Sequence, residues 1–183
     1  MRIIGGKYKR RLIRPPKNLP VRPTTDLAKE SLFNIIQHKT EVRDKSALDL
    51  FSGTGSIAYE FASRGCATVY AVERDTRCVR FIKQTATDFG MEQLKTVHSD
   101  VFRFLNPRTP RFDIIFADPP YQMKNIEEIP KLIFKYDLLL PGGLLVIEHP
   151  KEIDFSGQEH FVEHRRYGHV NFSFFQAKKN RLV

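Results

Sequence analysis

The stretch Ala47-Leu48-Asp49-Leu50-Phe51-Ser52-Gly53-Thr54-Gly55 decides the fold of this chain of 183 residues. Its first half is a short, mostly apolar run typical of a buried strand, and its second half is a glycine-rich turn. A helical stretch at 57–63 follows directly. Glycines between a strand and a helix permit a tight turn and let a ligand approach the backbone closely. The stretch therefore predicts one unit of an α/β sheet, with a ligand at the carboxyl end of the strand.

The same alternation of strands and helices continues along the chain. Strands are expected at 67–73, 96–98, 112–117 and 144–147, and helices after Pro23 with Thr24 or Thr25 as N-cap, at 75–89 and at 126–140, with a turn at 141–143. Residues 158–177 alternate weakly around Tyr167-Gly168, which indicates a closing antiparallel hairpin. Near-continuous apolar strands that alternate with helices indicate an open, mostly parallel α/β sheet covered on both faces.

The positive charge of the chain is concentrated at its N-terminus. The formal net charge is +9, and residues 1–25 contain eight basic and no acidic residues. Such a segment suits a polyanion, because each cation that neutralises a phosphate releases a counterion. The candidate RNA-binding residues are Arg2, Lys7, Tyr8, Lys9, Arg10, Arg11, Arg14 and Lys17. We therefore divide the chain into a basic arm, 1–24, and a main domain, 25–183. Apolar residues interleave with these charges, which favours a short strand pair packed on the body over a solvated tail.

Composition excludes several classes of protein. Hydrophobic residues make up 41% of the chain and charged residues 28%, so it can bury a core. No apolar stretch is long enough to cross a bilayer, and the N-terminus lacks the apolar block of a secretory signal. Two cysteines and six scattered histidines predict neither a disulfide framework nor a metal site. We expect a cytoplasmic monomer without a metal.

The glycine-rich turn is compatible with two nucleotide cofactors. Gly53-Thr54-Gly55 followed by Ala58 satisfies a dinucleotide-binding pattern, and Glu73 ends the next strand, where an acid can accept both ribose hydroxyls. A nicotinamide dinucleotide and S-adenosylmethionine both fit this arrangement. Asp49 favours S-adenosylmethionine, because an acid near the turn suits an ammonium and a sulfonium better than phosphates. Asp100, with the backbone of Val101, can bind an adenine amino group, or cap a short helical turn, or do both.

Asp118-Pro119-Pro120-Tyr121 follows an apolar strand at the same edge of the sheet. A simple turn is one interpretation, because proline pairs commonly form turns. The four residues also suit the methylation of an exocyclic amine, whose lone pair is delocalised into a nucleobase. The Asp118 carboxylate and the Pro119 carbonyl would accept its two N–H groups and stabilise the positive charge that develops. The prolines would hold that carbonyl rigidly, and Tyr121 would stack on a base that has left its helix.

These segments together resemble class I S-adenosylmethionine-dependent amino-methyltransferases. The opening residues Met1 to Lys9, the run Arg22-Pro23-Thr24-Thr25-Asp26 and Ser31-Leu32-Phe33-Asn34-Ile35 are similar to the RsmD family, which methylates guanine N2 in bacterial 16S ribosomal RNA. The resemblance extends to about Glu148. It implies a Rossmann-like fold with a seven-stranded sheet, a substrate within the small ribosomal subunit and a contact with a ribosomal protein.

The resemblance also implies roles for individual residues. Phe51, Gly53 and Gly55 would line the methionine half of the cofactor, and the helix that follows Arg22 and Thr24 would bind its carboxylate. Asp118 to Tyr121 would hold the target guanine. The full set of cofactor candidates is Arg22, Thr24, Asp49, Phe51, Gly53, Gly55, Glu73, Arg74, Asp100 and Val101. Ser52 and Thr54 depart from the residues that the family favours, and the family tends to have an arginine near Leu27, where this chain has Leu-Ala-Lys.

Three other functions compete with this one. A DNA or RNA adenine-N6 methyltransferase would use the same chemistry, since adenine also offers an exocyclic amine, but a DNA enzyme needs a recognition module for which the chain has no room. A nicotinamide-dependent oxidoreductase would leave Asp118 to Tyr121 without a role. A non-catalytic RNA-binding assembly factor could keep the same fold.

Overall fold

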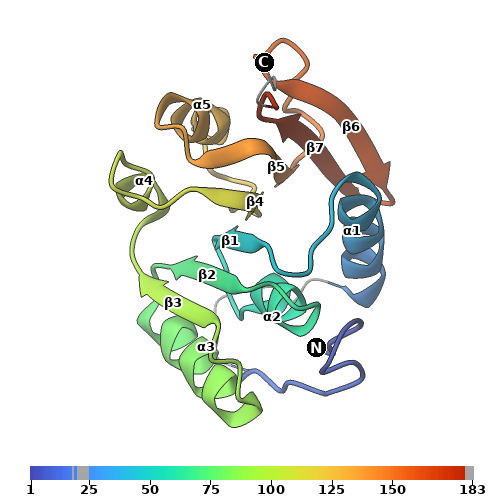
Figure 1. Cartoon of the computed structure of the whole chain (residues 1–183), viewed down its shortest axis with the longest axis vertical. Coiled ribbons are helices and arrows are strands. Elements are labelled where there is room, and N and C mark those ends of the chain that lie inside the picture. Colours follow the sequence, from blue (N-terminus) through green and yellow to red (C-terminus); the bar gives the residue numbers. More distant parts are fainter. Residues whose placement is uncertain (18, 20–24, 180–183) are drawn as a thin grey trace.

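The computed structural model describes residues 1–17, 19 and 25–179. The elements are α1 (Asp26–Lys39), β1 (Ser46–Leu50), α2 (Ser56–Ser63), β2 (Thr68–Glu73), α3 (Thr76–Phe89), β3 (Leu94–His98), α4 (Val101–Phe104), β4 (Phe112–Ala117), α5 (Glu128–Lys135), β5 (Leu139–His149), β6 (Phe161–Tyr167) and β7 (Val170–Gln176). One seven-stranded sheet has the order β3-β2-β1-β4-β5-β7-β6, with β7 antiparallel to both of its neighbours and the other pairs parallel (Figure 1). The mostly parallel α/β sheet with a closing hairpin is confirmed.

Helices cover both faces of the sheet, as the continuous apolar strands predict. α1, α2 and α3 lie on one face, and α4 and α5 lie on the other (Figure 1). Successive strand residues point to opposite faces, so Phe116 packs under the first group of helices while Ile115 and Ala117 pack under the second. This alternation also sets the direction of the polar residues that follow each strand.

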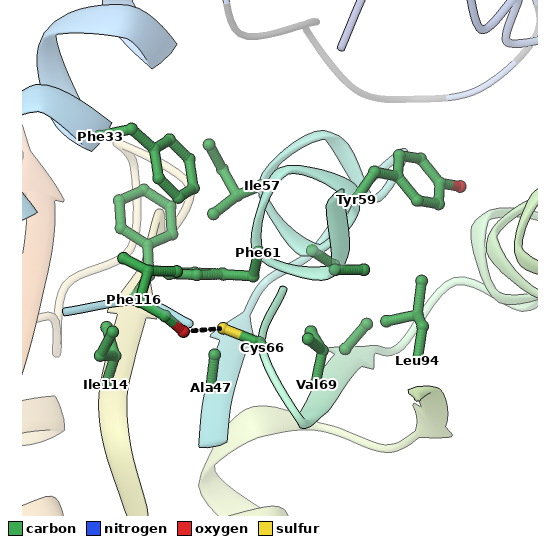
Figure 2. Close-up of a cluster of buried hydrophobic side chains, with 14 of the residues drawn as sticks. Phe33, Ala47, Ile57, Tyr59, Phe61, Cys66, Val69, Leu94, Ile114 and Phe116 are labelled. Atoms are coloured by element: carbon green, nitrogen blue, oxygen red, sulfur yellow. Dashed lines mark hydrogen bonds between the residues drawn. The ribbon is translucent and has the colours of Figure 1, made fainter. Parts of the chain in front are cut away.

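The core under α1 and α2 is built from aromatic side chains. Phe33 from α1 and Phe61 from α2 pack edge to face, with their ring centroids 5.0 Å apart (Figure 2). Below them lie Ala47, Val69 and Ile114 from three neighbouring strands, all without solvent exposure. This packing holds β1 and its glycine-rich turn against α2.

Two boundaries near the C-terminal half differ from the prediction. The helix expected at 126–140 ends at Lys135, and β5 begins at Leu139, before the expected turn at 141–143. Asp137 has a φ of 53°, a left-handed conformation that an α-helix cannot continue through. Leu139 then pairs with Phe112, and the register shifts before Ile114 pairs with Leu144. The segment 141–143 is therefore an irregularity within a long strand rather than a connection between elements.

The basic arm is folded and packed on α2. Arg2 and Leu12 form an antiparallel bridge, and the backbones of Met1 and Ile13 exchange hydrogen bonds of 2.9 and 3.0 Å. Ile3 and Ile13 are buried in the same core as α1 to α3. The interleaved apolar residues therefore do anchor this segment on the body. Arg22 and Thr24 lie outside the described residues.

A buried ion pair fastens the arm between α1 and α2. Glu60 has no solvent exposure, and its carboxylate lies 3.5 Å from the Lys29 ammonium and 3.3 Å from Nε of Arg64. The backbone N–H of Ile4 donates a hydrogen bond of 2.6 Å to the same carboxylate, and Lys29 donates to the carbonyl of Arg2. The two charges thus find partners in three segments that are distant in sequence.

Replacing Lys29 with Met should destabilise the protein by about 3 kcal/mol, because Glu60 would remain buried with one of its two cations removed. Urea unfolding measures this difference in the free energy of unfolding. The matched control is Lys131→Met, since Lys131 forms an exposed ion pair with Glu128 and its loss should change little. An effect of Lys29→Met as small as that of the control would contradict this account of the arm.

Candidate active site

Each of the five parallel strands contributes one acidic residue at its carboxyl end. These residues are Asp49 from β1, Glu73 from β2, Asp100 after β3, Asp118 after β4 and Glu148 from β5. Because the carboxyl ends of parallel strands meet at one edge of a sheet, the five acids lie along a single edge. Sequence reasoning selected four of them as site residues and named Glu148 only as the approximate limit of the family resemblance.

The turn after β1 has the backbone geometry of a ligand-binding loop. Phe51, Gly53 and Gly55 all have positive φ, at 60°, 54° and 83°. A side chain at Gly55 would place its Cβ 2.8 Å from the ring of Tyr59, so only glycine fits there. A non-glycine residue in this region is strained, and Phe51 is held in that conformation. The turn is therefore a tight, partly left-handed segment at the carboxyl end of β1, with Phe51 and Gly53 partly exposed.

Glu73 ties the turn to the second strand. Its Oε2 accepts a hydrogen bond of 2.9 Å from the backbone N–H of Gly53, and its Oε1 accepts one of 2.7 Å from the N–H of Asp75. The carboxylate is 9% exposed, at the edge where a nucleotide ribose is expected. The geometry thus brings Glu73 and the glycine turn together, as their spacing of 20 residues predicts.

Asp49 is almost completely buried below the same turn. Its Oδ2 accepts a hydrogen bond of 3.1 Å from the N–H of Ala58, and Ser52 donates to its backbone carbonyl. Burial raises the pKa of Asp49 from 3.8 to about 8, against the opposing effect of these hydrogen bonds. Within the described residues, no lysine or arginine forms an ion pair with this carboxyl. A cationic ligand would lower that pKa again, so the site suits a sulfonium and an ammonium.

Asp118 lies beside Asp49 and Glu148. The N–H of Asp118 continues the pairing of β4 with β1 by donating to the carbonyl of Leu50 at 3.4 Å. Burial raises the pKa of Asp118 well above its usual range, and the charges of Glu148 and Asp49 raise it further. Pro119 is buried, and the carbonyl of Pro120 accepts a hydrogen bond from Met123, which closes the turn. The segment therefore holds a carboxyl and a carbonyl rigidly at the edge of the sheet.

The structure places the remaining described candidates for the cofactor site, Asp100, Val101 and Arg74, in three different environments. Asp100 caps α4, because its Oδ1 accepts hydrogen bonds of 2.9 and 3.2 Å from the N–H groups of Phe102 and Arg103. That confirms the capping role, for which only Oδ1 is used. Val101 is buried, and Arg74 is exposed with its backbone carbonyl against the ring of His98.

Residues 1–7 of the basic arm run beside α2 from one edge of the sheet to the opposite edge. The first is the edge that carries the five acids, which we call the active edge. Met1 contacts Thr54 of the glycine turn, whereas Lys7 donates through its N–H to the carbonyl of Ser63 at the far end of α2. α2 has eight residues, so these two contacts of the arm are separated by about 12 Å along the helix. The seven basic candidates are all exposed.

Tyr8 is a correction to the predicted RNA-binding set. It is 6% exposed, its ring packs against Phe89, and its hydroxyl donates to the carbonyl of Gly90. The ring is therefore part of the core and cannot stack on a base at the surface. The position of Tyr8 between charged residues indicates a side chain that anchors the arm on the body. The prediction that Tyr8 contacts RNA was wrong.

Neither a metal centre nor a membrane segment is found in the part of the chain that the structure describes. No cluster of three or more histidine, cysteine or acidic side chains is arranged to bind a metal ion. No described helix is long and apolar enough to span a bilayer.

The strand order and the acids along one edge define a class I methyltransferase fold, and solved structures agree. A putative methyltransferase from Escherichia coli has a TM-score of 0.85 and 26% identity, covering 98% of this chain and 99% of its own. A protein from Thermus thermophilus has a TM-score of 0.83 and 28% identity, covering 97% and 99%. An RNA methyltransferase from Salinibacter ruber, solved with S-adenosyl-L-homocysteine, is alike in fold at 17% identity, with a TM-score of 0.66, covering 87% and 95%.

The chain belongs to the RsmD family, whose model, described as conserved hypothetical protein 95, matches residues 1–176. A putative rRNA methyltransferase from Bacillus subtilis is 33% identical over 84% of this chain and 85% of its own length. The ribosomal RNA small subunit methyltransferase D of Escherichia coli is 29% identical over 83% and 76%. The resemblance seen in the sequence is thus confirmed.

Replacing Asp49 with Asn should make stability less sensitive to pH. The folded protein retains a proton on Asp49 up to about pH 8, whereas the unfolded chain loses it near pH 4, so the wild type loses stability as the pH rises through this window. Asn cannot ionise and keeps the acceptor for Ala58. The stability of the variant relative to the wild type should therefore increase from pH 6 to pH 8, by up to about 1.4 kcal/mol per pH unit.

Urea unfolding at pH 6, 7 and 8 measures this trend, with the same substitution at the exposed Asp44 as the control. A stability difference that stays constant or shrinks with pH would contradict the raised pKa of Asp49.

Proposed function

We propose that this protein transfers a methyl group from S-adenosylmethionine to the exocyclic N2 amine of a guanine in 16S ribosomal RNA of the small subunit. The observation that carries the proposal is the placement of Asp118 near the buried Asp49 at the active edge of the sheet, where no described lysine or arginine forms an ion pair with Asp49. The names of its relatives support ribosomal RNA as the substrate. The enzyme acts in the cytoplasm as a monomer, and a ribosomal protein contributes to docking.

The residues of the glycine turn and its neighbours fit S-adenosylmethionine. Asp49 would face the cationic half of that molecule, Glu73 its ribose and Asp100 its adenine. Phe51 and Gly53 are both held with positive φ, and strained backbone of this kind is frequent at ligand sites. The bound cosubstrate supplies an electrophilic methyl group on a sulfonium.

Asp118 and Pro119 act on the amine. The Asp118 carboxylate and the Pro119 carbonyl accept one N–H each, which directs the nitrogen lone pair towards the methyl group. As the new N–C bond forms, the bond between the methyl group and the sulfonium sulfur breaks, and S-adenosylhomocysteine is the leaving group. Positive charge develops on the nitrogen, and the Asp118 carboxylate stabilises it. Burial raises the pKa of Asp118, so the same carboxylate is suited to take the proton that the amine must lose.

The first experiment is transfer of a labelled methyl group to small ribosomal subunits from a strain that lacks this gene, followed by nucleoside analysis by mass. We expect label in N2-methylguanosine. Label in N6-methyladenosine would agree with the proposed mechanism but would show that the target base is adenine and not guanine. Absence of label, with measurable binding of S-adenosylmethionine, would favour the non-catalytic assembly factor.

In the same assay, Asp118→Ala should lower turnover by about 10²-fold or more, because it removes an electrostatic contact made in the transition state. Binding of S-adenosylmethionine should stay within a few-fold of the wild type. The same change at the exposed Asp154 is the control. Turnover equal to that of the control would refute the role of Asp118.

The arm should bind RNA phosphates along α2. Replacing Lys7, Lys9, Arg14 and Lys17 with Ala should reduce the salt dependence of subunit binding, with the slope of log K against log salt falling by about 3. Lys131 and Lys135, both exposed on α5 at the other face of the sheet, provide the matched control pair. A slope equal to that of the wild type would mean that the arm does not contact phosphate.

A further inference from the structure

Glu148 and Asp118 are neighbours on one face of the sheet. Ala117 and Ile147 are paired in register between β4 and β5, and both point into the core under α4 and α5. The next residue of each strand, Asp118 and Glu148, therefore points to the opposite face. Neighbouring strands lie about 4.8 Å apart, which places the two carboxyls side by side.

Glu148 has an incomplete set of partners. It is 8% exposed, and the hydroxyl of Tyr121 donates a hydrogen bond of 3.1 Å to its Oε1. No described residue donates a hydrogen bond to Oε2 of Glu148. No described lysine or arginine forms an ion pair with Glu148 or with Asp118. A largely buried carboxylate oxygen that receives no hydrogen bond is costly in free energy. The free oxygen therefore calls for a donor from a ligand.

The base proposed as the substrate has donors in the required arrangement. The Watson–Crick edge of guanine carries two adjacent donors, N1–H and the N2 amine, and a base that has left its helix is read along this edge. Adenine presents its N6 amine beside an N1 that is an acceptor. Asp118 and Pro119 by themselves bind either amine, so they do not discriminate between the two bases.

We propose that Glu148 is the residue that selects guanine, by accepting the N1–H of the base while Asp118 and Pro119 hold its N2 amine. Against adenine, the lone pairs of Glu148 would face the lone pair of N1, and its buried Oε2 would remain without a donor. Tyr121 fixes the carboxyl through its hydroxyl and stacks on the same base. This inference rests on the proposed function and adds to it the origin of base selectivity.

The discriminating substrate is 2-aminopurine, which keeps the 2-amine of guanine but has an unprotonated N1. It would replace the target guanine, located by the labelling experiment, in a ribosomal RNA assembled into small subunits. The wild type should prefer guanine by at least about 30-fold in kcat/KM, because a site built for a donor rejects a base that lacks it. Equal rates on the two bases would overturn the proposal without any variant.

Glu148→Gln isolates the contact with N1, because the absence of O6 from 2-aminopurine affects both enzymes alike. The amide can donate to an unprotonated N1, so the preference for guanine should shrink at least about tenfold. Glu148→Ala, which removes the acceptor, should also shrink it. A preference that stays unchanged in both variants would refute the contact.

Tyr121→Phe separates reading of the base from support of the tyrosine. If Glu148 only positions Tyr121, its variants and Tyr121→Phe will lower the rates on both bases by equal factors, which would overturn the proposal. We expect Tyr121→Phe to leave the preference for guanine within a few-fold of the wild type. A wild type that methylates no guanine at all refutes the proposed function itself, whereas guanine methylation with an unchanged preference refutes only the role of Glu148.

Discussion

Parallel pairing of β1 to β5 is the constraint on which the rest of the molecule depends. It brings the carboxyl ends of five strands to one edge, and each strand delivers one acid there. In an antiparallel sheet the same residues would be divided between two edges. The order of the strands then decides which acids are neighbours, so that Asp49, Asp118 and Glu148 come from the three central strands β1, β4 and β5.

Such an edge is electrostatically unfavourable in the free protein. Burial raises the pKa values of Asp49, Asp118 and Glu148, and the charges of Glu148 and Asp49 raise that of Asp118 further. None of the three forms an ion pair within the described residues. This instability is consistent with a site that is completed by its substrates: a cationic cosubstrate faces Asp49, and a base rich in N–H donors faces the other two. Reduced stability of the free enzyme would then contribute to the affinity and selectivity of the complex.

The basic arm shows the opposite treatment of charge. Glu60 is as deeply buried as the acids of the active edge, but it is surrounded by Lys29, Arg64 and a backbone N–H of the arm. Its charge is therefore satisfied, and the arm is held on α2 in one position with its other cations at the surface. The protein thus contains two kinds of buried acid. Glu60 has cationic partners within the fold, whereas Asp49, Asp118 and Glu148 would obtain their partners from bound ligands.

The sequence alone predicted most of the helices and strands and the parallel sheet. It also selected the acids Asp49, Glu73 and Asp118 as site residues. These predictions succeed because apolar periodicity and turn residues are local signals. The sequence missed the end of α5 at Lys135, since the left-handed Asp137 and the pairing of Leu139 with β4 are decided by tertiary contacts. It also gave Tyr8 a surface role and Glu148 none. Only the tertiary structure decides whether an aromatic ring in a basic segment points into the core, and which strand ends become neighbours, because both depend on contacts between residues far apart in the chain.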